Sequence, residues 1–209
     1  MTLRILLADD HAIVRQGIKN LLTNAGYSVV GEATDGREAI QLARESTPDI
    51  ALLDLSMPLL NGIDAAREIL KVSRQTKCIM LTLQKEGPCV TEAFRAGAKG
   101  YVLKIQGAED LIEAIRAVSR GSVYVSPGIS DVMDEGTVES PLPPEPLTPR
   151  EREILQLIVE GKSSKEIADV LGISFHTVES HRTRMMSKLG IHERAGLVRY
   201  AIRRGMIRP

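Results

Sequence analysis

The sequence is poor in aromatic residues and in cysteine. Among its 209 residues are four Tyr, two Phe and no Trp, so the hydrophobic cores must consist mainly of aliphatic side chains. Cys78 and Cys89 are the only cysteines, and their spacing matches no metal-binding motif. We therefore expect neither a disulfide nor a cysteine-based metal site, and we interpret both residues as small buried apolar side chains.

The sequence also lacks a long hydrophobic segment. No uninterrupted apolar run approaches the ~18 residues that a membrane-spanning helix needs. The residues that follow Met1 do not form a targeting signal. These two absences predict a cytoplasmic protein without a membrane partner.

The net charge of zero hides an uneven distribution along the chain. Residues 145–209 hold 12 Lys and Arg against 8 Asp and Glu, whereas residues 1–144 hold 15 against 19. The second part is therefore basic and the first part acidic. This asymmetry predicts two domains with different partners, and nucleic acid is a natural partner for the basic one.

The first 120 residues alternate between short apolar runs and longer segments with helical periodicity, which is typical of an α/β fold. Runs that are apolar throughout indicate strands buried on both faces. The predicted strands are Arg4–Ala8, Ser28–Ala33, Ile50–Asp54, Lys77–Thr82 and Gly100–Leu103, and the predicted helices cover about 12–25, 36–46, 62–72, 87–96 and 108–119. Right-handed crossovers then predict a flavodoxin-like, doubly wound, five-stranded parallel sheet with helices on both faces.

The remainder of the chain has a different organisation. Residues 122–145 have no sustained periodicity and end in a proline-rich stretch, so we interpret them as a linker between domains 1–121 and 146–209. After the linker the pattern is purely helical. Thr148 and Ser163 each precede a glutamate at capping-box spacing, and Ser174 precedes a third helix. Two of these helices, joined by a short turn at Gly172, form the pattern of a helix-turn-helix within a small four-helix domain.

Polar residues converge at the carboxyl ends of the predicted strands, where open α/β sheets place their functional groups. Asp9 and Asp10 follow the first strand, Asp54 ends the third, Thr82 ends the fourth, and Lys104 follows the fifth. Neighbouring carboxylates repel one another unless a cation lies among them, and oxygen ligands suit Mg²⁺. A carboxylate can also act as a nucleophile toward phosphorus. Asp54, at the end of the central strand, is the best candidate for that role.

Lys104 and Thr82 complete this chemistry. A transferring phosphoryl group carries its charge on its oxygens, so it needs fixed positive and hydrogen-bond donors rather than a strong base. Lys104 supplies a fixed cation and Thr82 a hydroxyl group. Taken singly, Lys104 would be an ordinary surface lysine and Thr82 a β-branched strand residue. Their joint placement at strand ends favours the functional interpretation.

The segments Leu7-Ala8-Asp9-Asp10-His11, Leu53-Asp54-Leu55-Ser56-Met57-Pro58, Leu81-Thr82 and Tyr101-Val102-Leu103-Lys104 resemble the receiver domains of response regulators. The resemblance covers residues 3–120. It implies that Asp9 and Asp10 hold Mg²⁺ beside Asp54, that Asp54 accepts a phosphoryl group from a sensor histidine kinase, and that Thr82 and Lys104 complete the site. It also implies that the Tyr101 rotamer follows a movement of Thr82, although a half-buried strand tyrosine is common without such a role.

The sequence departs from the receiver pattern in two loops. Leu59-Leu60 stands where the family often carries glycine, which concerns a turn rather than the chemistry. Residues 83–85 and Ile105 replace residue types that are common beside the phosphoryl site. The lifetime of a phosphorylated state therefore does not follow from the resemblance.

The third helix of the second domain has the features of a DNA-recognition helix, which presents its first residues to base edges while nearby basic residues hold phosphates. Val178, Met185 and Leu189 are predicted to face the core. The candidate DNA contacts are Lys165, Thr177, Glu179, Ser180, His181, Arg182, Thr183, Arg184 and Lys188. Alternatives stay open for six of them. Glu179 can accept from cytosine or weaken phosphate attraction, and His181 can have a packing or capping role. Any of the four basic residues can be an ordinary solvated charge: Lys165, Arg182, Arg184 and Lys188.

Residues 146–208 closely resemble the LuxR-type DNA-binding domain, on the segments 147–153, Lys165-Glu166-Ile167-Ala168, Thr177-Val178-Glu179-Ser180-His181 and Lys188-Leu189-Gly190. With the receiver segments before them, the whole chain resembles transcriptional regulators of the NarL/FixJ type. This resemblance implies binding to double-stranded promoter DNA and a homodimer in the phosphorylated state. It also implies that the chain is no enzyme apart from Mg²⁺-dependent phosphorylation and dephosphorylation of its own Asp54.

Two other functions fit parts of the sequence. The helical domain could bind protein in a signalling or phosphotransfer module, but its basic charge and helix-turn-helix spacing disfavour this. The strand-end residues would also suit a small phosphatase, but the sequence shows no separate acid, base or substrate pocket. Binding to promoter fragments in a gel-shift assay separates both alternatives from the DNA-binding hypothesis.

Overall fold

The computed structural model describes residues 2–83, 87–129 and 146–207. The chain divides into two compact units, Met1–Pro141 and Leu142–Pro209. Most of the predicted linker, residues 130–145, lies outside the described residues, as do Gln84 and Lys85. None of the described helices has the length and apolarity needed to cross a bilayer.

The first unit contains a parallel sheet in the order β2-β1-β3-β4-β5-β6. The five predicted strands are present with the predicted bounds: β1 (Arg4–Ala8), β2 (Ser28–Ala33), β3 (Ile50–Asp54), β4 (Lys77–Thr82) and β5 (Gly100–Leu103). β3 lies inside the sheet, and all five of its residues are buried. This explains why its sequence is apolar up to the final aspartate.

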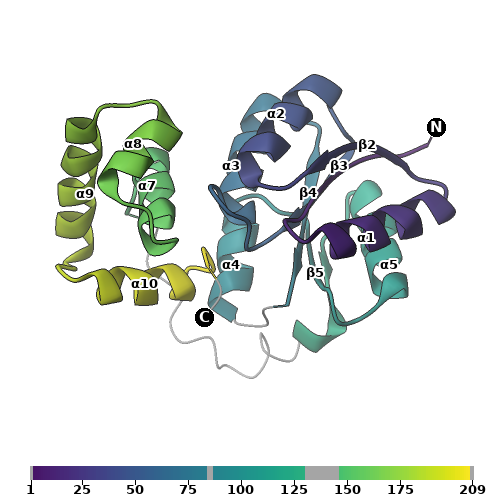
Figure 1. Ribbon diagram of the computed structural model, residues 1–209. Helices are drawn as coiled ribbons and strands as arrows, with labels where there is room; N and C mark the ends of the chain where they lie inside the picture. The colour runs from purple at the N-terminus through teal and green to yellow at the C-terminus, as the bar shows by residue number, and fades with distance from the viewer. Residues whose placement is uncertain (1, 84–86, 130–145, 208–209) are drawn as a thin grey trace. The chain divides into compact units, whose positions relative to one another are not determined.

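Five helices cover the two faces of this sheet, as the predicted doubly wound fold requires (Figure 1). They are α1 (Ala12–Asn24), α2 (Gly36–Ser46), α3 (Gly62–Val72), α4 (Gly87–Arg95) and α5 (Ala108–Ser119). The apolar residues of α1 and α5 pack with Ile5 and Leu7. Those of α2, α3 and α4 pack with Leu6 and Leu53. Alternate residues of the central strands therefore serve two separate hydrophobic cores.

The sheet has six strands rather than the five expected. β6 (Tyr124–Val125) pairs with β5 and lies in the stretch interpreted as the start of the linker. Its side chains explain its position: the Tyr124 hydroxyl donates to Asp110 Oδ1 at 2.6 Å, and the Ser126 hydroxyl donates to the other oxygen of Asp110. Burial and the Asp110 carboxylate raise the pKa of Tyr124. A two-residue strand leaves no periodic signal in the sequence, so this element was missed.

The second unit consists of α7 (Pro149–Val159), α8 (Ser164–Leu171), α9 (Phe175–Leu189) and α10 (Arg194–Arg203). The predicted caps are confirmed. Thr148 with Glu151 and Ser163 with Glu166 form capping boxes, and Ser174 accepts from the Thr177 backbone N–H. Gly172 ends α8 with a φ of 62°, a conformation that glycine adopts without strain, and so forms the turn into α9.

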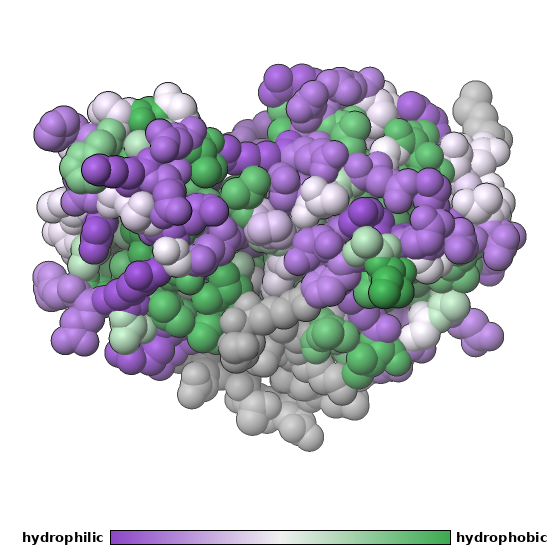
Figure 2. All heavy atoms as spheres, viewed as in Figure 1, coloured by the Kyte–Doolittle hydropathy of each residue, from purple (hydrophilic) through white to green (hydrophobic). Residues whose placement is uncertain are grey.

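The cores of both units are aliphatic, as the shortage of aromatic residues predicted. Cys78 and Cys89 are buried free thiols, and burial raises the pKa of Cys78 to about 12. Figure 2 shows a surface that is hydrophilic over most of the visible face, with smaller apolar areas between the polar residues.

Candidate functional site

Carboxylates gather where β1 and β3 end. Ala8 pairs with Leu53 in these adjacent strands, so Asp9, which follows β1, lies beside Asp54, the last residue of β3. Asp9 and Asp54 have exposed fractions of 0% and 1%. Asp9, Asp10, His11 and Asp54 each offer one ligand atom, and these atoms all lie within 4.8 Å of one another. The strand ends therefore bring together all three predicted carboxylates, in an arrangement that suits an oxygen-preferring divalent cation.

Lys104 places a positive charge between two of these carboxylates. Its Nζ lies 2.7 Å from Asp9 Oδ2 and 2.9 Å from Asp54 Oδ1, and only 11% of its side chain is exposed. The Lys104 backbone N–H donates to the Thr82 carbonyl at 2.8 Å, which fixes the loop after β5 to the end of β4. Because buried carboxylates are costly without a partner, the Lys104 ammonium offsets part of the cost of burying Asp9 and Asp54 side by side.

His11 belongs to this site, although no role was predicted for it. Its Nδ1 lies 2.7 Å from Asp10 Oδ1 and 3.4 Å from Asp9 Oδ1, and its backbone N–H donates to Asp9 Oδ1 at 2.9 Å. Nearby, Arg15 donates to the Asp9 carbonyl at 2.6 Å. The position of His11 directly after two aspartates was the one available signal. A single histidine in such a place is compatible with a structural role as well as a chemical one, so the sequence alone did not assign His11 to the site.

Thr82 lies on β4, the strand next to β3, and Tyr101 lies on β5, one strand further out. Thr82 ends β4 and is 2% exposed, so it occupies the same edge of the sheet as Asp54. Tyr101 lies in β5, opposite Met80, and is completely buried in the core beneath α2, α3 and α4. The structure therefore places Thr82 at the site and Tyr101 beneath it.

The loop between β3 and α3 is tightly built. A Cβ atom added at Gly62 would lie 2.1 Å from the Asp54 carbonyl oxygen, so only glycine fits there. Leu59 has a φ of 63°, a left-handed conformation that costs a non-glycine residue roughly 1–2 kcal/mol. This is the position where the sequence departs from the receiver pattern. Leu83 and Ile105, two further departures, are 52% and 60% exposed.

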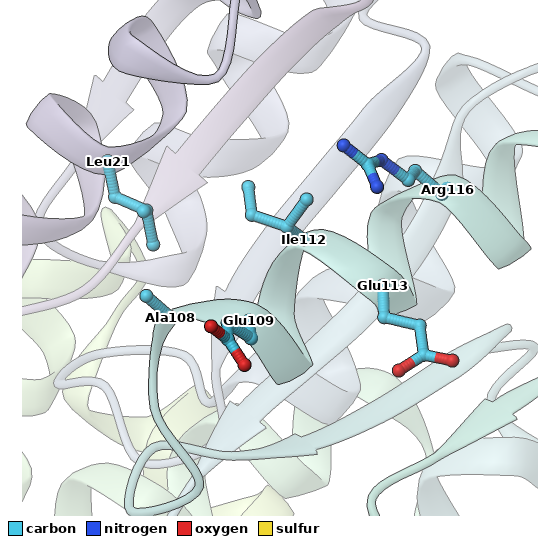
Figure 3. A pocket seen from close by; sticks show the side chains of 6 residues that line it. All are labelled: Leu21, Ala108, Glu109, Ile112, Glu113 and Arg116. Atoms are coloured by element: carbon cyan, nitrogen blue, oxygen red, sulfur yellow. The ribbon is translucent and has the colours of Figure 1, made fainter.

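Two hollows lie near α1 and α5. One of about 500 Å³ is lined by Leu21 of α1 and by five residues of α5, among them Ile112 and Arg116 (Figure 3). A second of about 290 Å³ is lined mainly by aliphatic residues and reaches Lys104. Neither lining contains the carboxylates of the cluster, so these two hollows do not add a substrate pocket of the kind that a phosphatase acting on other molecules would need.

The second unit contains the predicted helix-turn-helix. Val178 and Met185 of α9 are buried and face the core, whereas Leu189 is only half-buried. The opposite side of α9 is open to solvent. The exposed candidate DNA contacts are Lys165, Thr177, Ser180, Thr183, Arg184 and Lys188, and the half-buried ones are Glu179, His181 and Arg182.

Four of these candidates have side-chain partners within the unit: Thr177, Glu179, Arg182 and Lys188. Glu179 Oε1 accepts from the Ser164 hydroxyl of α8 at 2.5 Å, and Arg182 lies 3.7 Å from the same oxygen. Lys188 Nζ donates to Glu151 Oε2 at 2.7 Å. Glu179 and Lys188 therefore help to hold α9 against its neighbours, a structural role that sequence reasoning considered for neither residue.

Lys188→Met is expected to destabilise the second unit by about 1–2 kcal/mol at neutral pH, because it leaves the Glu151 carboxylate, 2% exposed, without its cation. Burial tends to raise the pKa of Glu151, but the hydrogen bonds from Lys188 and Thr148 outweigh burial and lower it. A lowered pKa contributes stability that is lost as the pH falls through the folded-state value. The difference between variant and wild type should therefore shrink in acid. Urea unfolding monitored by circular dichroism, at neutral and at acid pH, measures this difference in the free energy of unfolding.

Lys165→Met is the matched control, since Lys165 is an exposed lysine of α8. Its free energy of unfolding should stay within about 0.5 kcal/mol of wild type. Equal midpoints for Lys188→Met and wild type would show that the pair with Glu151 contributes no stability.

Comparison with known proteins supports this description of both units. Residues 5–116 match the family model described as "Response regulator receiver domain", and residues 145–201 match "Bacterial regulatory proteins, luxR family". The transcriptional regulatory protein MctR of Rhizobium johnstonii is 38% identical over 206 residues, covering 98% of this chain and 95% of that protein. The transcriptional regulatory protein LiaR of Bacillus subtilis is 39% identical over 211 residues, covering 98% of this chain and 99% of LiaR.

Solved structures show the same likeness. A two-component response regulator of the LuxR family from Aurantimonas is 41% identical and superimposes with a TM-score of 0.62, covering 66% of this chain and all of that one. The complex of the response regulator RcsB with DNA superimposes with a TM-score of 0.61 at 28% identity, covering 96% of this chain and 98% of that one.

Proposed function

The chain belongs to the two-component response regulators that join a receiver domain to a LuxR-type DNA-binding domain, and we propose that phosphorylation of Asp54 by a sensor histidine kinase controls its binding to promoter DNA. The observation that carries the proposal is the buried cluster of Asp9, Asp54 and Lys104, with Lys104 Nζ within 2.9 Å of both carboxylates. A buried acidic site with a fixed cation at strand ends suits a group whose charge changes during the reaction.

The proposed reaction is a transfer to one oxygen of Asp54. That oxygen forms a bond to phosphorus while the bond between phosphorus and the donor group breaks, and the electron pair leaves with the donor. Lys104 then pairs with a phosphoryl oxygen in place of the carboxylate, and the Thr82 hydroxyl donates to another. Each contact exists only in the modified state, so each can bias the conformation of the domain.

The carboxylates of Asp9, Asp10 and Asp54 fit a Mg²⁺ site, because they are oxygen donors grouped within 4.8 Å. When bound there, Mg²⁺ would neutralise charge on the phosphoryl oxygens. Under this proposal the chain carries out no turnover beyond phosphorylation and dephosphorylation of its own Asp54. The Tyr101 rotamer would follow Thr82, since both lie on strands next to each other.

The DNA-binding part of the proposal rests on α9. Its solvent-facing side carries Thr177, Ser180 and Thr183, which would reach base edges, while Lys165, Arg182 and Arg184 would hold phosphates. Glu179 and Lys188 would contribute more by holding α9 in place, and half-buried His181 remains a candidate contact. The similarity to RcsB, whose solved structures include two dimers bound to two DNA duplexes, supports binding as a homodimer. With promoter DNA as its partner, the protein would act in the cytoplasm.

The full-length chain should bind promoter DNA with an affinity that falls steeply with salt, since phosphate contacts release counterions. With three or four basic contacts, a plot of log affinity against log salt should have a slope of about −3 per bound protomer. Fluorescence anisotropy with a labelled promoter fragment measures the slope. Binding with no slope, or no binding to any promoter fragment, would contradict this part of the proposal, and the second result would favour a protein partner for the helical domain.

A further inference from the structure

A chain of buried polar contacts begins in the loop that follows Asp54. Asn61 is the N-cap of α3, and its Oδ1 accepts from the Asp64 backbone N–H at 2.9 Å. Its Nδ2 donates to Asp64 Oδ2 at 3.0 Å, so the two residues bind each other twice. Asn61 is 1% exposed and Asp64 is 4% exposed. The first turn of α3 is therefore joined to the loop by bonds that are shielded from water.

This turn also lies directly against the backbone of Asp54. The Gly62 backbone N–H donates to the Leu55 carbonyl at 2.9 Å, and the space beside Gly62 is filled by the Asp54 carbonyl. Interiors packed this closely transmit displacements rather than absorb them. A shift of the Asp54 backbone must therefore move Asn61 and the start of α3.

Arg67 extends the chain of contacts to another helix. Its Nη1 donates to Asp64 Oδ1 at 2.7 Å, and its Nη2 donates to Glu92 of α4. The Arg67 side chain is 20% exposed and the Glu92 side chain 6% exposed. A planar guanidinium with several N–H donors can hold two carboxylates at once, which makes arginine suited to this bridge. This bridge leaves no local signal in the sequence, because Arg67 and Glu92 lie 25 positions apart.

On its core side α4 packs through apolar residues: Cys89, Val90 and Ala93 lie in the hydrophobic core beneath the helix. Apolar packing is not directional, whereas a buried ion pair fixes one arrangement of the two elements. Removing one partner of such a pair is costly, but the net stabilisation that it provides is small. The bridge is therefore better explained by control of the α4 position than by stability.

We propose that Arg67 is a positioning residue that couples the phosphorylation site to α4, through Asn61 and Asp64 on one side and Glu92 on the other. This inference rests on the proposed role of Asp54. A phosphoryl group on Asp54 displaces the loop after β3, the cap of α3 moves with it, and Arg67 carries the displacement to Glu92. Without Arg67, α4 keeps its apolar packing but no longer follows the loop.

The test uses the full-length chain with Arg67→Met, which keeps most of the side-chain volume and removes both ion pairs. The readout is the ratio of operator affinities with and without phosphorylation, because a purely structural residue lowers stability without changing this ratio. We expect the ratio to fall by about threefold or more. Arg67→Lys keeps a positive charge between the two carboxylates, so its affinity ratio should lie between those of Arg67→Met and wild type.

Lys71→Met is the matched control. Lys71 lies on the same helix and pairs with Glu68 at 2.7 Å, but its side chain is 61% exposed and the pair stays within α3. The control should keep the wild-type ratio. An Arg67→Met protein that also keeps the wild-type ratio, whatever its melting temperature, would overturn the inference while leaving the proposed function intact.

Amide hydrogen exchange on the unphosphorylated proteins tests the same coupling without depending on the switch. In Arg67→Met, amides of α4 and of the α3 cap around Asp64 should both exchange faster than in wild type. Faster exchange in α4 alone would overturn the inference, since the bridge would then hold only one side. A wild-type protein that does not respond to phosphorylation refutes the proposed function, and the exchange result still decides whether Arg67 connects the two elements.

Discussion

Asp54→Asn is expected to abolish phosphoryl uptake from acetyl phosphate in the presence of Mg²⁺. The amide has nearly the shape of the carboxylate but no ionised oxygen to attack phosphorus. Asp54 is the one carboxylate that ends a central strand and lies within 2.9 Å of Lys104. The neighbouring carboxylate of Asp9 also contacts Lys104, and so it is the alternative acceptor. Intact-protein mass spectrometry followed by peptide mapping shows which of the two carries the phosphoryl group.

Two variants serve as controls for Asp54→Asn. Asp49→Asn changes an exposed carboxylate just before β3, at the opposite end of this strand, and should leave the rate unchanged. Asp10→Asn removes an oxygen from the acidic cluster and should slow uptake without preventing it, with partial recovery at higher Mg²⁺. Uptake of one phosphoryl group by Asp54→Asn at the wild-type rate would show that the acceptor is a different residue.

Phosphorylation is expected to raise the operator affinity of the full-length chain by about 5–150-fold, which corresponds to a coupling free energy of about 1–3 kcal/mol. The limit has a physical reason: the phosphoryl group can shift an equilibrium only by the difference in its interactions between the two states. The new contacts are those of one dianionic group with Lys104 and Thr82. A dimer that reads two half-sites adds affinity because both recognition helices bind at once.

Sedimentation equilibrium together with operator titrations, with and without a phosphate mimic, measures this second effect. The treated protein should contain more dimer at the same concentration, and its operator affinity should rise together with the dimer fraction. If the oligomeric state and the affinity are both unchanged, phosphorylation does not control DNA binding, and the receiver domain is a scaffold.

Much of the fold could be predicted because its signals are local. β1 to β5 are apolar runs that end at polar residues, so the alternation with helices gave both their bounds and the edge where Asp9, Asp54 and Lys104 meet. The helix caps at Thr148, Ser163 and Ser174 were predictable for the same reason, because a cap depends on residues within one turn of the helix.

The features that were missed depend on contacts between distant residues. β6 is held by Asp110, and Lys188 pairs with Glu151 across 37 positions. The bond between Ser164 and Glu179 changes the interpretation of a residue that sequence reasoning placed in the DNA groove. A charged side chain on a helix surface looks the same in sequence whether its partner is a phosphate or a carboxylate of the same domain. Only the packing of the helices distinguishes them.

The central claim is that a phosphoryl group on Asp54 sets the affinity for DNA. Its most direct test is a titration of one labelled operator fragment with wild type and Asp54→Asn, each with and without Mg²⁺ and acetyl phosphate. We predict that the affinity of wild type rises by about 5–150-fold on treatment, while Asp54→Asn binds as untreated wild type does under both conditions. An equal rise in both proteins, or no rise in either, would contradict the claim.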